Sequence, residues 1–259
     1  MQLYFEDTGT DKPPLLLIAG LASDAISWTF QLEAFAAEYR LITFDNRGVG
    51  RSPKPPGPYS IPEMADDVLK LLDHLQLPKV HILGHSMGGA VAQQLAITAP
   101  KRVGKLILAC TFSKLEGRSV PVVESWAGIL RLGASSELIG QALFPWLYTE
   151  RFLSAPGTLE ACQQALAQHP YPLEGDAITA QVAALRSFDS GADLAKIQAP
   201  CLVLAAALDL LVSPQSAKVL ADAIPHAQFR EVPNTAHSLM LETPDAFNEA
   251  VLDFLRQGC

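Results

Sequence analysis

The chain has 259 residues, of which 49% are hydrophobic and 18% are charged, and its formal net charge at pH 7 is −8. This length and composition predict a folded globular protein with a sizeable core rather than a disordered chain. The excess of acidic over basic residues argues against a nucleic-acid partner, which would require a basic face.

The opening segment and the cysteines bear on where the protein works. The segment MQLYFEDTGTDKPP has neither a basic stretch nor an apolar core, so we expect no secretory signal. No run of about 18 apolar residues occurs, so we expect no membrane span. The cysteines are scattered, without the spacing of a zinc site, and two of them lie in apolar runs that predict buried thiols (Cys110 and Cys201, beside Cys162 and Cys259). We therefore expect a cytoplasmic protein that uses no metal and no other cofactor.

The first part of the chain alternates predicted strands with predicted helices. A continuous apolar run, LLLIAG at Leu15–Gly20, is typical of a strand that is buried on both faces. A helix is predicted over Trp28–Ala37, and a second strand over Arg40–Asp45. The segment Pro62–Leu75 has a proline near its start and apolar residues along one side, which indicates an amphipathic helix.

A glycine-rich loop, FDNRGVGRS at residues 44–52, follows the second predicted strand. It lacks the Lys-Ser/Thr ending of a phosphate-binding loop. For Asp45 and Arg47 we prefer a structural interpretation, in which they pair or cap locally, over a catalytic one.

The stretch GHSMGG, at residues 84–89, follows a short apolar strand at Val80–Leu83 and opens a helix that ends near residues 99–100. It places Ser86 at a tight turn between the two. Glycines are needed around such a turn because side chains would collide where strand and helix close up. The bare pattern G-x-S-x-G is not rare, and an idle serine in a glycine-rich connection is the alternative. The strand before and the helix after favour a nucleophile elbow, with Ser86 as the nucleophile.

After a further strand at Lys105–Cys110, the alternation stops for residues 112–190. This region contains helix-like pieces and no strong strand, and a structureless loop of such length would be improbable. We expect a helical insertion over the carboxyl ends of the strands, where open α/β sheets bind ligands. A helical subdomain that serves only stability is the alternative. The predicted domains are a core of residues 1–111 and 191–259 and a cap of residues 112–190.

The alternation resumes in the last part of the chain. Strands are predicted over Cys201–Asp209 and Ala227–Pro233, and helices over Gln215–Ile224 and Asp245–Arg256. Alternating strands and helices imply a mostly parallel twisted sheet with helices on both faces. The fold class is therefore α/β, with a helical cap insertion.

A serine nucleophile needs a base to take its proton and an acid to orient that base. His237 lies in a loop directly after the last predicted strand, where its imidazole can reach over Ser86. Asp209 ends the preceding strand among leucines and alanines, where an unpaired carboxylate would be costly. Asp193 is the second candidate for the acid, although it is better placed to cap a short helix. We expect His85, beside the serine, to point away from the reaction.

The oxyanion of the reaction requires two backbone N–H groups. One should come from Met87, the residue after the nucleophile. The other should come from Leu21, which follows Gly20 in the loop after the first apolar strand. Gly20 lets this backbone turn close to the substrate, although a simple turn residue is the alternative there.

The assembled motifs resemble the α/β-hydrolase superfamily, and especially its small cap-bearing carboxylesterases and 3-oxoadipate enol-lactonase-like hydrolases. The matching pieces are AGLASDAISW, FDNRGVGRS, GHSMGG, LDLLVSP and NTAHSLMLETP. The resemblance implies Ser86 as nucleophile, Asp209 as acid and His237 as base, with Leu21 and Met87 as oxyanion donors and the insertion as the family's cap. Two departures loosen any subfamily assignment, because family members often have His-Gly at Ala19-Gly20 and a glycine at Ala206.

The proposed activity is hydrolysis of a carboxylic ester of a small, mainly apolar substrate through an acyl-enzyme. A serine at position 86 disfavours relatives that use an aspartate nucleophile. A lactonase and a methyl ester esterase with the same three residues remain alternatives, as do a C–C bond hydrolase and a serine-type haloperoxidase. A protein of another class, a ligand receptor or signalling protein that retains the triad, also remains.

Residues of the insertion and of the acid loop are the candidates for substrate binding. Large apolar side chains there would suit an apolar acyl or alcohol group. The predicted cap carries five Lys and Arg against eight Asp and Glu, which is a weak attraction for an acidic carrier protein. A carrier protein is therefore left open as a partner but is not favoured. The candidate binding residues are Phe112, Trp126, Phe144, Trp146 and Leu211.

Overall fold

A computed structural model describes residues 1–115 and 117–258 of the chain. Its centre is one seven-stranded sheet in the order β1-β3-β2-β4-β5-β6-β7, and all neighbouring strands are parallel except the edge pair β1 and β3. The strands are β1 (Phe5–Asp7), β2 (Pro14–Ile18), β3 (Arg40–Phe44), β4 (Val80–His85), β5 (Val103–Ala109), β6 (Cys201–Ala206) and β7 (Gln228–Val232). The expected fold class is confirmed.

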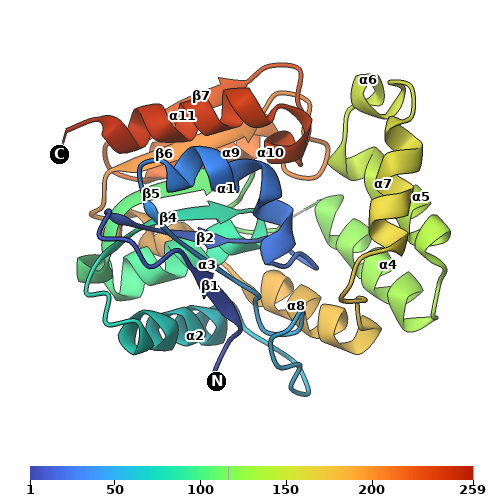
Figure 1. Ribbon diagram of the computed structural model, residues 1–259, viewed down its shortest axis with the longest axis horizontal. Helices are drawn as coiled ribbons and strands as arrows, with labels where there is room; N and C mark the ends of the chain where they lie inside the picture. The colour runs from blue at the N-terminus through green and yellow to red at the C-terminus, as the bar shows by residue number, and fades with distance from the viewer. Residues whose placement is uncertain (116, 259) are drawn as a thin grey trace.

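Helices cover both faces of the sheet (Figure 1). One face carries α2 (Ile61–His74), α3 (Met87–Thr98) and α9 (Pro214–Ala223), and the other carries α1 (Thr29–Ala36) and α11 (Pro244–Arg256). The start of α2 follows from its sequence, because the Ser60 hydroxyl accepts from Glu63 N and donates to the Glu63 carboxylate. Pro62 lies in the first turn, where its missing N–H needs no backbone partner.

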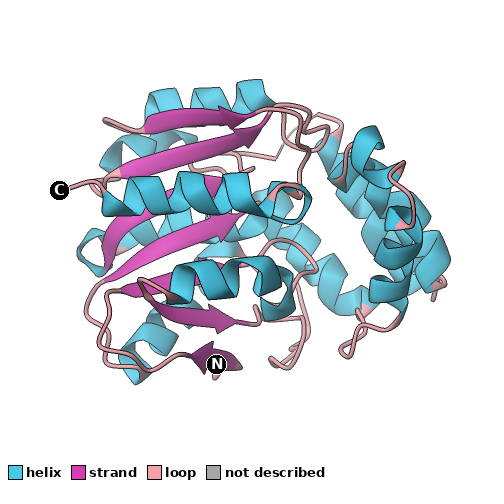
Figure 2. Cartoon of the chain, turned by 45° about the horizontal axis from the view of Figure 1, so that its top comes forward, coloured by secondary structure: helices cyan, strands magenta, loops and turns pink. Residues whose placement is uncertain are grey.

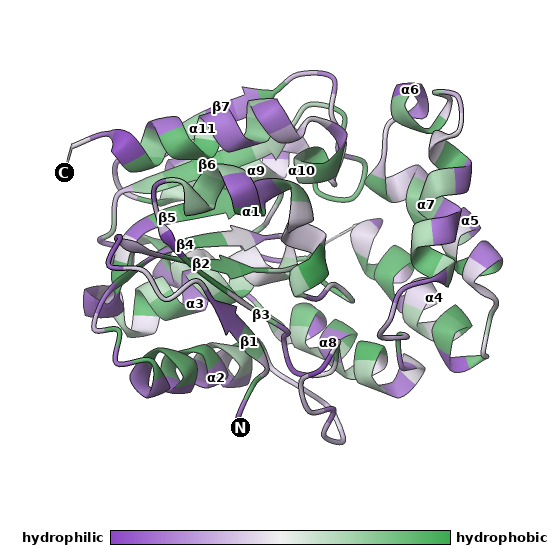
Figure 3. Cartoon of the chain, in the orientation of Figure 1, coloured by the Kyte–Doolittle hydropathy of each residue, from purple (hydrophilic) through white to green (hydrophobic). Residues whose placement is uncertain are grey.

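The alternation of side chains along the strands divides the core into two layers. In β2, Leu15 and Leu17 pack with the α1 and α11 side, whereas Leu16 and Ile18 pack with the α2, α3 and α9 side. All four leucine and isoleucine side chains are fully buried. Continuous apolar strands of this kind are required when both faces of a parallel sheet are covered, and the central strands are accordingly coloured as hydrophobic in Figure 3.

Among the described residues, five α-helices lie between β5 and β6, within the range proposed for the insertion. They are α4 (Ser119–Arg131), α5 (Ser136–Leu147), α6 (Glu150–Leu153), α7 (Thr158–Ala167) and α8 (Gly175–Ser187). Figure 2 shows them beyond the end of the sheet toward which the arrowheads of the parallel strands point. The carboxyl ends of these strands therefore face the inserted helices.

The two ends of the insertion meet at its base. Lys114 and Asp189 form an isolated antiparallel bridge, and Ser190 N donates to Ser113 O at 2.9 Å. The buried side chain of Gln93, from α3, donates to Phe112 O and accepts from Ser190 Oγ. We keep residues 112–190 as the proposed cap.

Several elements escaped the sequence-based expectation. The edge strand β1 and the single-turn helices α6 and α10 (Leu239–Glu242) were not expected, because each is too short to carry a periodic pattern. Among the described residues, no helix is long and apolar enough to cross a membrane.

Candidate active site

Ser86 stands at the turn between β4 and α3 with φ of 52° and ψ of −117°. A positive φ is strained for a residue with a side chain, so the surrounding structure must hold it. Ser86 N donates to Ala109 O at 2.9 Å, and Ser86 O accepts from Thr111 Oγ1 at 2.7 Å. The elbow is therefore fixed by the backbone of Ala109, at the end of β5, and by the Thr111 side chain that follows it.

The glycines around this turn are required by close approach of backbones. A Cβ on Gly88 would lie 2.1 Å from Ile18 O, and a Cβ on Gly84 would lie 2.4 Å from Gly88 O. A Cβ at either position would overlap backbone atoms that cannot swing away. The glycine spacing thus lets α3 start directly against β2 and β4.

Three side chains that are distant in the sequence form one hydrogen-bonded chain. His237 Nε2 lies 3.0 Å from Ser86 Oγ, and His237 Nδ1 lies 2.8 Å from Asp209 Oδ2. All three residues are buried. A nucleophile, a base and an orienting acid act through contacts of this length.

The carboxylate of Asp209 is held from two sides. Its Oδ1 accepts the N–H groups of Leu211 and Val212, both at 2.8 Å, which leaves Oδ2 for the imidazole. The thiol of Cys110 also contacts this carboxylate, and burial together with Asp209 raises the pKa of that thiol well above its usual range. Cys110 is therefore the buried, protonated thiol that was predicted. Asp193, the second candidate for the acid, instead pairs with Lys196 at the surface.

The expectation for His85 was wrong. Its side chain lies beside the hydrogen-bonded residues Ser86, His237 and Asp209. The ring centroids of His85 and His237 are 5.0 Å apart, and His85 Nε2 lies 2.9 Å from His237 O. A carbonyl oxygen only accepts, so Nε2 carries the proton and donates. His85 Nδ1 is buried without a hydrogen-bond partner among the described residues, and burial lowers the pKa of His85 to about 3. A neutral His85 thus supports the loop that carries His237.

The inserted helices also hold the His237 loop. Ser238 N donates to Leu147 O at 2.9 Å. Glu242 accepts from the N–H groups of Ala236 and Thr149 and from the Thr149 hydroxyl, which bridges the loop to the start of α6. Burial raises the pKa of the Glu242 carboxyl.

The segment after β2 lies directly across from the elbow. A Cβ on Gly20 would sit 3.1 Å from His85 Nδ1 and 3.3 Å from the Ser86 Cβ, which fits the predicted close approach. Leu21 follows on the wall of the same cavity as Ser86. Met87 is the first residue of α3, a position at which a backbone N–H has no partner within its own helix. The roles of Leu21 and Met87 as oxyanion donors remain predictions.

Asp45 and Arg47 have separate structural partners. Buried Asp45 accepts from Ala25 N, Arg51 N and Arg51 Nε, all within 2.9 Å. Arg47 instead pairs with Asp67 of α2. The loop at residues 44–52 therefore holds the start of the segment around Ala25 and does not enter the cavity.

A cavity of about 190 Å³ lies between the strand ends and the inserted helices, with Ser86 and His237 on its wall. Most of its lining is aliphatic or aromatic. No lysine, arginine, aspartate or glutamate is among the described residues that line it. Such a surface suits a neutral, apolar ligand, because an unpaired charge would be desolvated there.

Four of the five predicted binding residues line this cavity, namely Phe112, Trp126, Phe144 and Leu211. Trp146 does not, and the prediction for it is corrected. Leu143, Phe144 and Leu147 of α5 share the helix face that meets the cavity, whereas Trp146 falls between them in sequence and packs, half-buried, elsewhere against the core.

Several polar residues of the wall were not predicted from the sequence, namely Tyr148, Ser238, Ser23 and Ser27. Tyr148 follows α5, its hydroxyl is hydrogen-bonded with Ser238, and burial raises its pKa. Ser238 is adjacent to His237, and this adjacency was the available signal. Tyr148 carries no such signal, because only the path of the insertion brings it to the His237 loop.

One group of potential metal ligands occurs in the described part of the chain. Donor atoms of His85, Cys110 and His237 lie within 4.8 Å of one another. Both ring nitrogens of His237 are already hydrogen-bonded, to Asp209 and to Ser86. A metal bound to His237 would have to replace one of these hydrogen bonds. Metal binding and the hydrogen-bonded series Ser86, His237 and Asp209 therefore exclude each other.

The chain is similar in sequence to known proteins over nearly its whole length. A family model described as "Alpha/beta hydrolase family" matches residues 15–250. A protein named "Putative carbamate hydrolase RutD", from Variovorax paradoxus (strain S110), is 35% identical over 259 residues, which cover 98% of this chain and 96% of that protein.

Two solved structures are similar over nearly their full length. The enol-lactonase from Burkholderia xenovorans LB400 superimposes with a TM-score of 0.89 at 26% identity, covering 98% of this chain and 96% of that one. A thermophilic esterase from Thermogutta terrifontis, with malate bound, superimposes with a TM-score of 0.84 at 33% identity, covering 98% of this chain and 93% of that one.

Proposed function

The chain belongs to the alpha/beta hydrolase family, and from this premise we propose that it is a serine hydrolase that cleaves a carboxylic ester of a small, mainly apolar substrate. The observation that carries the proposal is the hydrogen-bonded chain of Ser86, His237 and Asp209 at the wall of an apolar cavity.

The proposed reaction has two halves. In the first, Ser86 Oγ attacks the ester carbonyl carbon while His237 Nε2 takes the serine proton and then gives it to the departing alcohol. In the second, water attacks the acyl-enzyme, His237 takes a proton from that water, and Ser86 leaves with it. Asp209 keeps the Nδ1–H tautomer, which leaves Nε2 free to accept. The N–H groups of Leu21 and Met87 receive the negative oxygen in both halves.

The cavity supports a neutral substrate of limited size. Its volume of about 190 Å³ is below the roughly 300–1,000 Å³ of pockets that hold drug-sized ligands. In the described part of the chain, its wall has no lysine or arginine to hold a carboxylate. Short uncharged acyl esters therefore fit better than dicarboxylate-derived lactones.

A second candidate activity is cleavage of a carbamate. It is favoured by the printed name of the Variovorax paradoxus relative, which covers almost the whole chain. Ester, lactone and carbamate all present a carbonyl to the same nucleophile, so one set of residues would serve each. A free carbamate is an anion, however, and the uncharged wall favours a neutral carbamate ester over it.

The test is a substrate panel with the wild type and Ser86→Ala. It compares short p-nitrophenyl esters, a neutral lactone, a methyl ester and an aryl carbamate by kcat/KM. We expect the short esters to lead and Ser86→Ala to lose about 10⁶-fold on all of them. A lead of lactone or carbamate would change the substrate class. Binding of the same compounds without turnover of any would favour a receptor that retains the triad.

A further inference from the structure

Gln181 is a buried polar residue in the middle of α8, and both ends of its side-chain amide are hydrogen-bonded. Its Oε1 accepts from Ala22 N at 3.0 Å, and its Nε2 donates to Arg47 O at 2.7 Å. The residue is wholly buried. It thus ties an inserted helix to two loops of the core that are more than a hundred residues away in sequence.

The tie to Ala22 falls beside the proposed oxyanion donor. Ala22 directly follows Leu21 and has φ of 59°, a left-handed conformation that an alanine rarely adopts without support. The N–H of Ala22 is fixed by Gln181, so the peptide between Leu21 and Ala22 cannot turn freely. The Leu21 N–H belongs to the preceding peptide, whose Gly20 O accepts from Ser23 N at 3.3 Å. Only the two backbone torsions of Leu21 separate that peptide from the one that Gln181 holds, so release of Ala22 N would let both peptides turn.

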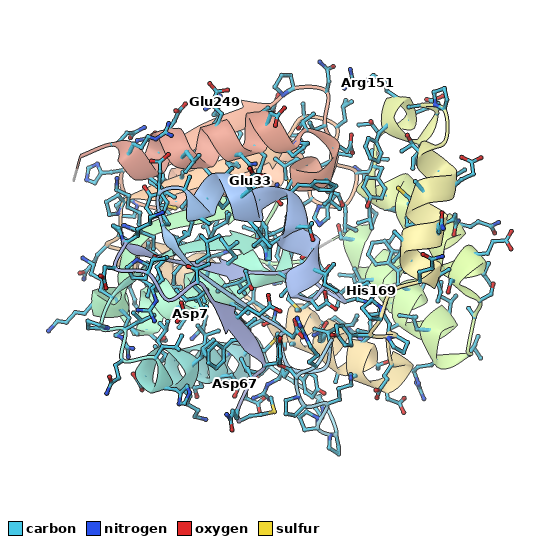
Figure 4. The ribbon with its side chains drawn as sticks, viewed as in Figure 1. Asp7, Glu33, Asp67, Arg151, His169 and Glu249 are labelled. Atoms are coloured by element: carbon cyan, nitrogen blue, oxygen red, sulfur yellow. The ribbon has the colours of Figure 1, made fainter. Side chains whose placement is uncertain are left out.

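A second contact joins the insertion to the same loop. His169, in the connection between α7 and α8, has its Nε2 3.4 Å from Asp24 Oδ2. Figure 4 labels His169 at this junction of core and insertion. Asp45 holds the loop from the core side through Ala25 N at 2.9 Å. The loop is therefore clamped between the core and the inserted helices, and Ala22 is held from the inserted side.

We propose that Gln181 is a positioning residue that holds the Leu21 N–H in the direction needed by the oxyanion, so that the insertion completes the oxyanion site as well as covering the cavity. This inference rests on the proposed function. It predicts that loss of the amide weakens stabilisation of the transition state more than binding of the ground state, because the negative oxygen exists only after Ser86 has attacked.

The test compares Gln181→Met with a matched control, Gln93→Met. Gln93 is also a wholly buried glutamine with both ends of its amide bonded, to Phe112 O and Ser190 Oγ, but it holds the base of the insertion and not the loop of Leu21. Both substitutions remove one buried amide of the same size. Gln181→Glu serves as the conservative variant, because its acid form keeps one acceptor and one donor.

Two readouts are measured on folded protein, namely kcat and KM for p-nitrophenyl butyrate and the Ki of a trifluoromethyl ketone. Ser86 Oγ adds to the carbonyl carbon of this ketone, the serine proton passes to His237, and the carbonyl oxygen becomes an oxyanion. We expect Gln181→Met to lower kcat by about 10- to 100-fold and to raise Ki in parallel, with KM changed less than about 3-fold. Gln93→Met should keep kcat and Ki within about 3-fold, and Gln181→Glu should recover most of kcat.

An unchanged kcat and Ki in Gln181→Met, or equal losses in Gln181→Met and Gln93→Met, would overturn the inference. Should the methionine variant not fold, Gln181→Asn gives the same reading, because its amide is one carbon too short to bridge both partners. Failure of the proposed function is seen separately, since the wild type would then not hydrolyse the ester at all.

Discussion

His85 Nε2 donates to the backbone oxygen of His237 at 2.9 Å, so the neighbour of the proposed nucleophile supports the loop of the proposed base. One turn of backbone at the elbow thereby positions two of the reacting groups together. The third, Asp209, is fixed independently by the N–H groups of Leu211 and Val212.

The bonding of Asp209 predicts a sharp effect of Asp209→Asn. The two backbone N–H groups require an acceptor, so the amide oxygen takes the place of Oδ1 and the amide nitrogen faces His237 Nδ1. An amide nitrogen only donates, which forces the imidazole proton onto Nε2, where it cannot accept from Ser86. We expect kcat to fall by about 10⁴-fold in a folded protein. Steady-state kinetics check this, and Asp193→Asn, at the surface, should leave kcat unchanged.

The elbow predicts that Gly88→Ala is damaging. Its Cβ would lie 2.1 Å from Ile18 O, so strand or helix must shift. We expect a loss of at least about 1–3 kcal/mol in the free energy of unfolding. Gly128→Ala is the control, because Gly128 lies inside α4 with nothing within 4 Å of its Cβ position, and it should gain about 0.5–1 kcal/mol. Thermal unfolding of the two variants should therefore change in opposite directions.

The cavity wall predicts which tryptophan controls substrate size. Trp126→Leu widens the cavity and should raise kcat/KM for longer acyl esters relative to acetate by about 1–3 kcal/mol of discrimination. Trp146→Leu should leave the ratio unchanged, because Trp146 does not line the cavity. An ester series measured with both variants checks this. The same shift with Trp146→Leu would mean that Trp146 also contacts the substrate, which contradicts its place outside the cavity wall.

Burial of neutral His85 predicts a dependence of stability on pH. Burial lowers the pKa of His85 from 6.5 to about 3, so the unfolded chain binds more protons than the folded one between these values. The free energy of unfolding is therefore highest above pH 6.5 and falls on acidification, by up to about 1.4 kcal/mol per pH unit from this residue. His85→Gln, which retains a side-chain N–H donor, should lose this slope.

Urea unfolding at pH 7.5 and pH 5 measures that slope. His81→Gln is the control. Burial also lowers the pKa of His81, but this residue is only half-buried, so its contribution to the pH dependence should be smaller. His81→Gln should therefore keep most of the slope of the wild type. Equal loss of stability on acidification in wild type and His85→Gln would contradict the assignment.

The parts of the fold that were predictable are those with local signals. The apolar run Leu15–Ile18 indicated a buried strand, and the glycines around Ser86 indicated a tight turn between strand and helix. Asp209 and His237 were predicted to meet Ser86 because each follows a strand whose end had to face the elbow. Parallel strands place such loops at one edge of the sheet, and the structure brings the three side chains together there.

The parts that were not predictable depend on distant contacts or on one backbone angle. The strand β1 is three residues long and is defined by its pairing with β3. The His85 side chain meets the backbone of His237, 152 residues away in sequence, and no local pattern reports that contact. Gln181 is separated from Ala22 by 159 residues, and its neighbours in α8 give it no distinguishing pattern. Trp146 has a large aromatic side chain, as some lining residues do, but it lies outside the helix face that meets the cavity.

The proposed role of Ser86 is tested most directly by reaction with an alkyl fluorophosphonate, followed by mass spectrometry of the whole protein and its peptides. We expect one phosphonyl group per chain, on Ser86 Oγ, with release of fluoride and loss of ester hydrolysis in proportion to labelling. Ser238→Ala, which removes the other serine beside His237, should still be labelled, and Ser86→Ala should not. Full ester hydrolysis by the labelled protein, or by Ser86→Ala, would contradict the role of Ser86 as the nucleophile.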